Sequence, residues 1–257
     1  MKKILPSILL SILICLNSGA DEKAKTNTMI FVKGNAAVSS FYICDHEVTQ
    51  AEYSAMMGEN PSQYYGDNKP VETVTWYDAV EYCNRRSKKE GLTPCYKIDK
   101  SKEDPNNHNE YDQQKWLVTW DRSANGYRLP TDSEWEWAAK GGEKSKKYTY
   151  SGSNKLSDVA WFYENSENTT NDVKTKRPNE LGIYDMSGNV WEWCWDWYED
   201  NPKKSGKDYA GASSGEYRVT RGGCWSVVPT ECKVTNRNND RPDEADDLLG
   251  FRVVRNY

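Results

Sequence analysis

The chain has 257 residues, a length that suits one large domain or two small ones. It carries 34 Lys and Arg against 39 Asp and Glu, and its basic residues are scattered, which argues against a nucleic-acid partner. Only two His are present, His46 and His108, so neither a His-based metal cluster nor a Ser-His-Asp triad is expected. The mean hydropathy is strongly negative, but 11 Trp and 17 Tyr can still supply a large buried area.

The N-terminus has the pattern of a secretory signal over residues 1–20. Two lysines precede an apolar run at 4–16 that is too short to span a membrane. Two cleavage sites remain open: one before Asp21, and a lipoprotein-type site before Cys15, which would then carry the lipid. The alternative is that Cys15 is an apolar residue of a discarded signal. We expect an exported protein at the outer surface, attached to the membrane only by that lipid, with one domain over 21–257.

Six cysteines remain once Cys15 is set aside. An even number suits an exported domain, but six allow fifteen pairings. Cys83 and Cys95 could form a disulfide or remain as buried thiols. No C-x-x-C is present, which argues against a zinc knuckle or a thioredoxin-type site. The six are Cys44, Cys83, Cys95, Cys194, Cys224 and Cys232.

The first predicted elements are two strands and a helix. Alternating apolar residues favour strands at Met29–Val32 and 38–43. Thr49 is followed three residues later by Glu52, which is a capping box. We expect the helix that it opens to stop at Gly58.

Two more capping boxes predict two further helices. Thr75 is followed by Asp78, and Thr131 by Glu134, at the same spacing of three residues. Each helix is expected to end at the glycine that follows its last turn. Between them, 97–114 is polar and is expected to form an exposed hairpin.

The second half of the chain is rich in loops. Residues 144–176 are polar and irregular, and the Trp- and Gly-rich stretch at 178–193 is expected to be a compact turn with packed aromatic side chains. The last forty residues begin with 221–225 and end with 250–254, both apolar and Gly-containing, around an irregular polar middle. Such a segment displays loops on a rigid scaffold, where binding sites commonly lie.

Three separated motifs resemble one known family. They are YRLPT at 127–131, LGIYDMSGNVWEW at 181–193, and RGG at 221–223 together with GFR at 250–252. Their order and spacing resemble the sulfatase-modifying-factor domain of formylglycine-generating enzymes. The resemblance implies an α+β fold, a loop-rich single domain with the C-type lectin fold of the formylglycine-generating-enzyme type.

The same resemblance bears on catalysis. These enzymes oxidise a substrate cysteine with a pair of cysteines that hold copper, and the matching positions here are Val227 and Cys232. One thiol is therefore missing, and because copper needs thiolates placed together, we expect no copper and no oxidase activity. Cys224 is expected to point elsewhere on an extended strand, and Cys232 to be a buried core residue.

The terminal segment also resembles the variable regions of proteins diversified by retroelements, of the treponemal surface-lipoprotein type. In such regions, over about 218–257 here, Asn codons are rewritten while scaffold codons stay fixed. A rewritten Asn codon cannot give Lys or Glu, so Glu231, Lys233 and Glu244 are scaffold or come from other codons. The expected variable residues are Ser226, Val227, Val228, Thr230, Asn236, Asn238, Asn239, Asp240, Arg241, Asp243, Asp246, Asp247 and Leu248.

This second resemblance implies a monomeric, non-catalytic protein that binds a ligand through its variable residues. A protein ligand or cell-surface target is the expected partner, with a glycan as second choice. Nucleic acid is not expected. An active formylglycine-generating oxidase and an invariant adhesion domain of the same fold are the alternatives.

The family resemblance further implies a structural calcium site. The matching ligands are the side chains of Asp185 and Glu192 and the backbone carbonyls of Gly188 and Val190. Carboxylate and carbonyl oxygens suit a hard cation. A metal-free turn held by packed Trp side chains is the open alternative. The Glu-Pro-Asn signature of sugar-binding lectins is absent, so carbohydrate specificity does not follow.

Overall fold

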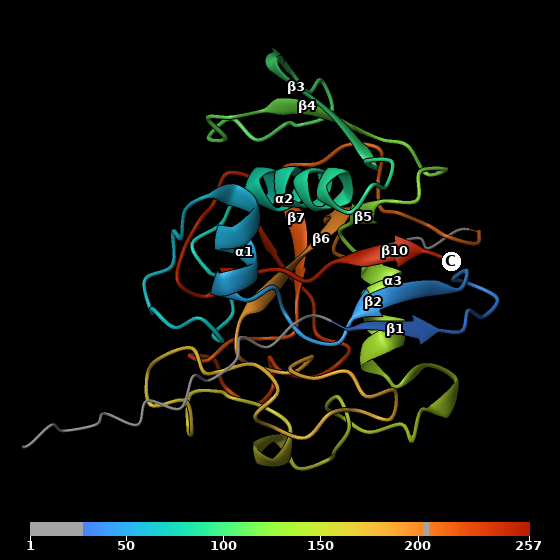
Figure 1. Ribbon diagram of the computed structural model, residues 1–257. Helices are drawn as coiled ribbons and strands as arrows, with labels where there is room; N and C mark the ends of the chain where they lie inside the picture. The colour runs from blue at the N-terminus through green and yellow to red at the C-terminus, as the bar shows by residue number, and fades with distance from the viewer. Residues whose placement is uncertain (1–27, 203–205) are drawn as a thin grey trace, which may run out of the picture.

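The computed structural model describes residues 28–202 and 206–257. The expected signal, including Cys15, lies outside these residues. Within them the chain folds into three α-helices, several small sheets and long loops (Figure 1). No helix in this part of the chain is both long and apolar enough to cross a membrane.

All three predicted capping boxes are confirmed. In each helix the Thr side chain accepts a hydrogen bond from the third backbone N–H, and the acidic side chain at that position accepts one from the Thr backbone N–H. These bonds satisfy donors that a helix start otherwise leaves without partners. The first helix also ends as predicted, at Gly58, whose φ is 88°. The helices are α1 (Gln50–Met57), α2 (Trp76–Lys89) and α3 (Asp132–Ala139).

The strands form three sheets. The first has the order β1-β2-β10-β5, so that strands from the two ends of the chain share one sheet. The second is the hairpin β3-β4, which confirms the hairpin expected there, although Asp104, Asn107, Asn109 and Asp112 of the stretch expected to be exposed are buried. The third has the order β8-β7-β6-β9 and includes β8 and β9 of the terminal segment. The strands are β1 (Met29–Val32), β2 (Phe41–Cys44), β3 (Tyr96–Glu103), β4 (Trp116–Trp120), β5 (Tyr127–Arg128), β6 (Trp191–Trp197), β7 (Arg218–Arg221), β8 (Asn238–Asp240), β9 (Leu249–Gly250) and β10 (Val254–Asn256).

Two predictions about this third sheet were wrong. The stretch predicted as a compact turn continues into β6, whose residues are nearly all buried. Trp alternates with Glu192, Cys194 and Asp196 along this strand, which is a period-two strand pattern that the compact-turn prediction overlooked. The terminal segment predicted as irregular contains β8, which pairs with β7. The three polar residues of β8 have no strand signature, because the pairing rests on backbone hydrogen bonds rather than on side-chain pattern.

The core is rich in aromatic residues, as the composition indicated. Trp76 and Trp193 are fully buried, and their indole N–H groups donate to the carbonyls of Cys194 (3.0 Å) and Val74 (2.9 Å). These bonds join α2 and its approach loop to β6. The six cysteines of the described chain are all buried and unpaired, so Cys83 and Cys95 are thiols here.

Candidate binding surface

The terminal segment leaves the third sheet through a tight turn after β7. Gly222 and Gly223 have φ values of 102° and 80°, and a Cβ at Gly223 would lie 2.8 Å from the Cys232 sulfur. Only glycine fits so close an approach in this left-handed conformation. The expectation that Cys224 continues an extended strand was therefore wrong, because β7 ends at Arg221.

Buried ion pairs fix both ends of the segment. Arg221 is fully buried and pairs with Asp132 at 2.7 Å and with Glu136, both of helix α3. At the other end Arg252 pairs with Glu192 of β6. The scaffold at each end is thus held by residues outside the expected variable set.

Trp225, at the start of the terminal segment, contacts Asp247 near the end of that segment. Its backbone N–H donates to the Asn189 carbonyl (2.8 Å), and its indole N–H donates to the Asp247 carbonyl (2.9 Å). The Tyr64 ring packs edge-on against it, with centroids 5.4 Å apart. One fixed aromatic side chain therefore orders a segment that has little regular structure.

None of the thirteen expected variable residues is buried. Val228 and Thr230 are exposed, and the other eleven are half-buried. Three aspartates have structural roles: Asp240 accepts from the Thr220 hydroxyl (3.0 Å), Asp243 from the Gln113 N–H (2.8 Å), and Asp246 from the Leu248 N–H (3.0 Å). The remaining side chains are in position to meet a ligand.

The surface of the segment is acidic. The thirteen residues include four aspartates and one arginine. Burial raises the pKa of Asp240 to about 7, and the nearby Asp246 and Glu244 add to the rise while Thr220 opposes it. Burial also raises the pKa of Asp246. The segment therefore has more acidic than basic side chains, although Asp240, Asp243 and Asp246 also accept hydrogen bonds within the fold.

The expected calcium ligands fit the cation only in part. Both Glu192 oxygens bind Arg252, at 2.6 and 2.7 Å, and one of them also accepts from the Trp135 indole at 2.8 Å. The guanidinium of Arg252 therefore already balances the negative charge of Glu192. Asp185 is different: one oxygen accepts from the Lys174 N–H (2.8 Å), and the other is buried without a hydrogen-bond partner.

Buried carboxylates outnumber buried basic groups around Asp185. Burial raises the pKa of Glu47 well above its usual value, and Asp185 and Glu192 raise it further. The charge of Arg252 lowers the pKa of Glu47, and the charges of Arg252 and His46 lower that of Asp185. An unpartnered Asp185 oxygen in such a place suits a cation, with the Gly188 and Val190 carbonyls on the same turn. Among the described residues, however, no group of three or more His, Cys, Asp or Glu is arranged to hold a metal.

The positions that match the copper pair carry one thiol. Val227 is half-buried where the first cysteine is expected, and Cys232 is fully buried. Burial raises the pKa of Cys232 above its usual range, and neighbouring Cys224 adds to this rise; burial also raises the pKa of Cys224 to about 11. Both groups are therefore neutral thiols at neutral pH, a poor starting point for copper.

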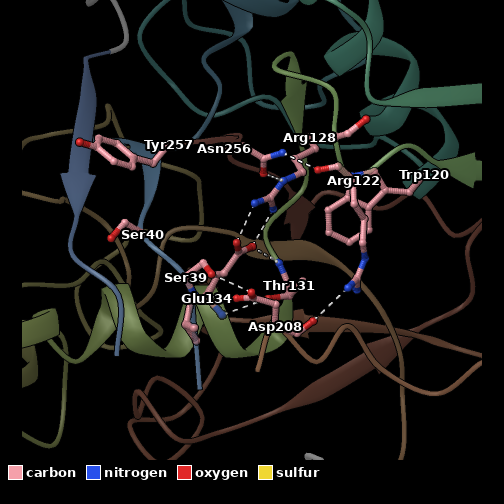
Figure 2. A pocket seen from close by; sticks show the side chains of 12 residues that line it. Ser39, Ser40, Trp120, Arg122, Arg128, Thr131, Glu134, Asp208, Asn256 and Tyr257 are labelled. Carbon is pink, nitrogen blue, oxygen red and sulfur yellow. Dashed lines mark hydrogen bonds and ion pairs between the residues drawn. The ribbon is translucent and has the colours of Figure 1, made fainter. Parts of the chain in front are cut away.

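A separate hollow of about 380 Å³ lies between the first sheet and β4 (Figure 2). Sequence reasoning treated Glu134 only as a capping residue. In the structure its two oxygens also bind Arg128, each at 2.7 Å, and Figure 2 shows this pair at the base of the hollow. Arg122 lies beside it, with its guanidinium 4.8 Å from the Trp120 ring centroid. The polar groups mainly satisfy one another, which is typical of a structural network.

The helices, small sheets and loop-borne terminal segment define an α+β domain of the C-type-lectin-like, formylglycine-generating-enzyme type, as predicted. The family model described as "Sulfatase-modifying factor enzyme 1-like domain" matches residues 14–257, and the chain belongs to that family.

Three relatives illustrate the range of the family. The chain is similar in structure to Treponema denticola variable protein 1, with a TM-score of 0.76 and 35% identity over 91% of this chain and 93% of that one. It is 43% identical to "Chaperone protein LppX" of Paenibacillus barcinonensis, over 95% of this chain and 89% of that protein. The formylglycine-generating enzyme of Streptomyces coelicolor is 34% identical over 50% of this chain and 46% of the enzyme.

Proposed function

We propose that this protein is a non-catalytic ligand-binding protein that displays variable residues on a C-type lectin scaffold. The observation that carries the proposal is the exposure of the terminal segment. None of the thirteen expected variable residues is fully buried, although the Asp243 side chain is only 8% exposed, whereas the residues that fix the segment, Arg221, Trp225 and Arg252, lie outside that set. Binding residues on ordered loops lose little conformational entropy when a ligand binds.

The similarity to a variable protein over most of both chains supports this assignment. The family's enzymatic chemistry has less support, because one of the two positions for copper cysteines carries Val227. We propose a protein ligand or cell-surface target as partner, with a glycan as second choice. The protein would act as a monomer at the outer surface, anchored by lipid on Cys15.

Deep sequencing of the last forty codons in a population of cells tests the proposal directly. Substitutions confined to the thirteen positions, together with an adenine-matched template repeat nearby, are the expected result. An invariant segment without a repeat would overturn variable display and leave an adhesion domain of fixed specificity.

One observation favours a second candidate function. The 43% identity to a protein named as a chaperone extends over nearly the whole chain. A chaperone would bind exposed apolar segments of unfolded proteins without selecting one folded target. The test is light scattering from thermally unfolding citrate synthase: suppression at equimolar chain supports chaperoning, and unchanged scattering argues against it.

A further inference from the structure

Large apolar side chains are unusually exposed beside the terminal segment. Tyr65 and Tyr163 are 74% and 62% exposed, and Val228 of the segment itself is 53% exposed. Exposed tyrosines on loops that contact the terminal segment require an explanation, because exposed apolar surface commonly marks an interaction site.

Hydrogen bonds and ring contacts place both tyrosine-bearing loops against the segment. The Tyr163 N–H donates to the Val227 carbonyl at 3.2 Å. In the other loop, Tyr64 packs on Trp225, and Tyr65 follows it in the chain. One loop thus contacts the start of the segment through its backbone, and the other through an aromatic pair.

The two loops are also joined to each other. The Lys69 ammonium donates to the Thr169 hydroxyl at 2.9 Å, and the Val173 N–H donates to the Asn68 carbonyl at 2.9 Å. Figure 1 draws these loops in cyan and yellow on the left and lower left, away from the C-terminus on the right. The tyrosines therefore flank the segment on a cross-linked frame.

We propose that Tyr64, Tyr65 and Tyr163, here called the tyrosine rim, form an invariant part of the binding surface shared by all variants of the terminal segment. The rim rests on the proposed binding function, and it gives the rim and the variable residues different roles in binding. Tyrosine contributes large contact area with few rotatable bonds, which is why it is enriched at binding hot spots. The rim supplies affinity, and the segment supplies selectivity.

The partner that this variant fits is a polypeptide surface with apolar and basic residues together. Apolar side chains match the exposed rings, and Lys or Arg match the acidic balance of residues 226–248, which carry six Asp and Glu against three Lys and Arg. Complementary charge of this kind sets specificity and speeds association.

Panning a random dodecapeptide phage library against the full mature chain tests the proposal. Enriched peptides are expected to combine Lys or Arg with aromatic or aliphatic residues. Their affinities are then measured as synthetic peptides by fluorescence polarisation. The double variant Tyr65→Ser/Tyr163→Ser is expected to bind at least tenfold more weakly, whereas Tyr257→Ser, an equally exposed tyrosine in another place, should bind as the parent does.

A second variant, Val228→Lys/Thr230→Lys, separates the rim from the segment. Loss of binding in both double variants supports the proposal. Loss in the segment variant alone overturns the rim and leaves the proposed function standing. Loss in the rim variant alone, or in neither, overturns the proposed function. Enrichment of acidic peptides overturns the basic partner, and enrichment of none overturns recognition of polypeptides. Circular dichroism of each variant establishes that it is folded.

Discussion

Replacing Arg252 with Met is expected to destabilise the fold strongly. The guanidinium contacts Glu192 at 2.6 and 2.7 Å and also donates to the carbonyls of Cys44 (3.3 Å) and Tyr184 (3.1 Å). Both charged side chains are fully buried. Removing one partner of such a pair leaves a charge buried without compensation.

The expected loss in the free energy of unfolding is about 3–5 kcal/mol. Two further features place Arg252→Met toward the upper end. Glu47 and Asp185 are buried near the same guanidinium, whose charge lowers the pKa of both, so its removal also affects these two acids. Two backbone carbonyls lose their donors as well, at about 1 kcal/mol each.

A double-mutant cycle tests this reasoning. Urea unfolding, followed by tryptophan fluorescence, is measured for Arg252→Met, Glu192→Gln and the double variant. The double variant should lose less stability than the two single losses combined, because the neutral amide that Glu192→Gln introduces no longer needs a cation. Arg85→Met, at an exposed pair with Glu81, is the control and should change stability by less than about 1 kcal/mol. Additive losses in the cycle would refute the central role of the buried pair.

Three further predictions follow from the segment and the turn beneath it. Since the pKa of Asp240 is raised to about 7, its stabilising contribution is present at pH 4 and lost as the pH rises to 7. Asp240→Asn should therefore gain on the order of 1–2 kcal/mol over the parent between pH 5 and 8 in urea titrations; an unchanged difference contradicts this. Calcium at 5 mM should raise the Tm of the parent by a few degrees but not that of Asp185→Asn, whereas an EGTA-insensitive Tm would argue for a metal-free turn. Anaerobic titration with Cu(I) should show no stoichiometric binding; a complex lost in Cys232→Ser would instead support the oxidase.

The helices and the fold class were predictable because their signals are local. Thr49, Thr75 and Thr131 each precede an acidic residue at the spacing that closes a capping box, and the structure has all three. The motifs at 127–131 and 181–193 indicated the family for the same reason. Strand β8 was not predictable, because its partner β7 lies about twenty residues away and its polar residues have no alternation.

The site was predictable as a segment but not as a surface. The codon argument identified thirteen residues by their type, yet it contained no information about neighbours from other loops. Tyr65 and Tyr163 lie far from the segment in sequence, and contacts that the sequence does not reveal, among them those of Trp225 and Val227, bring their loops beside it. Similarly, the Glu192 motif indicated calcium, while its partner Arg252 lies sixty residues further along the chain.

Under the proposed function, the arrangement would let a segment of changing content keep one fold. Its ends are fixed by buried pairs, Arg221 with helix α3 and Arg252 with β6, and its path is fixed by backbone bonds to Trp225. Backbone bonds do not depend on the side chains that vary. Asp240 and Asp243 are exceptions, because their carboxylates accept hydrogen bonds from Thr220 and Gln113 of the scaffold. Substitution at these two positions changes the shape of the surface as well as its chemistry, so a rewritten codon there affects the ligand through the conformation of its neighbours.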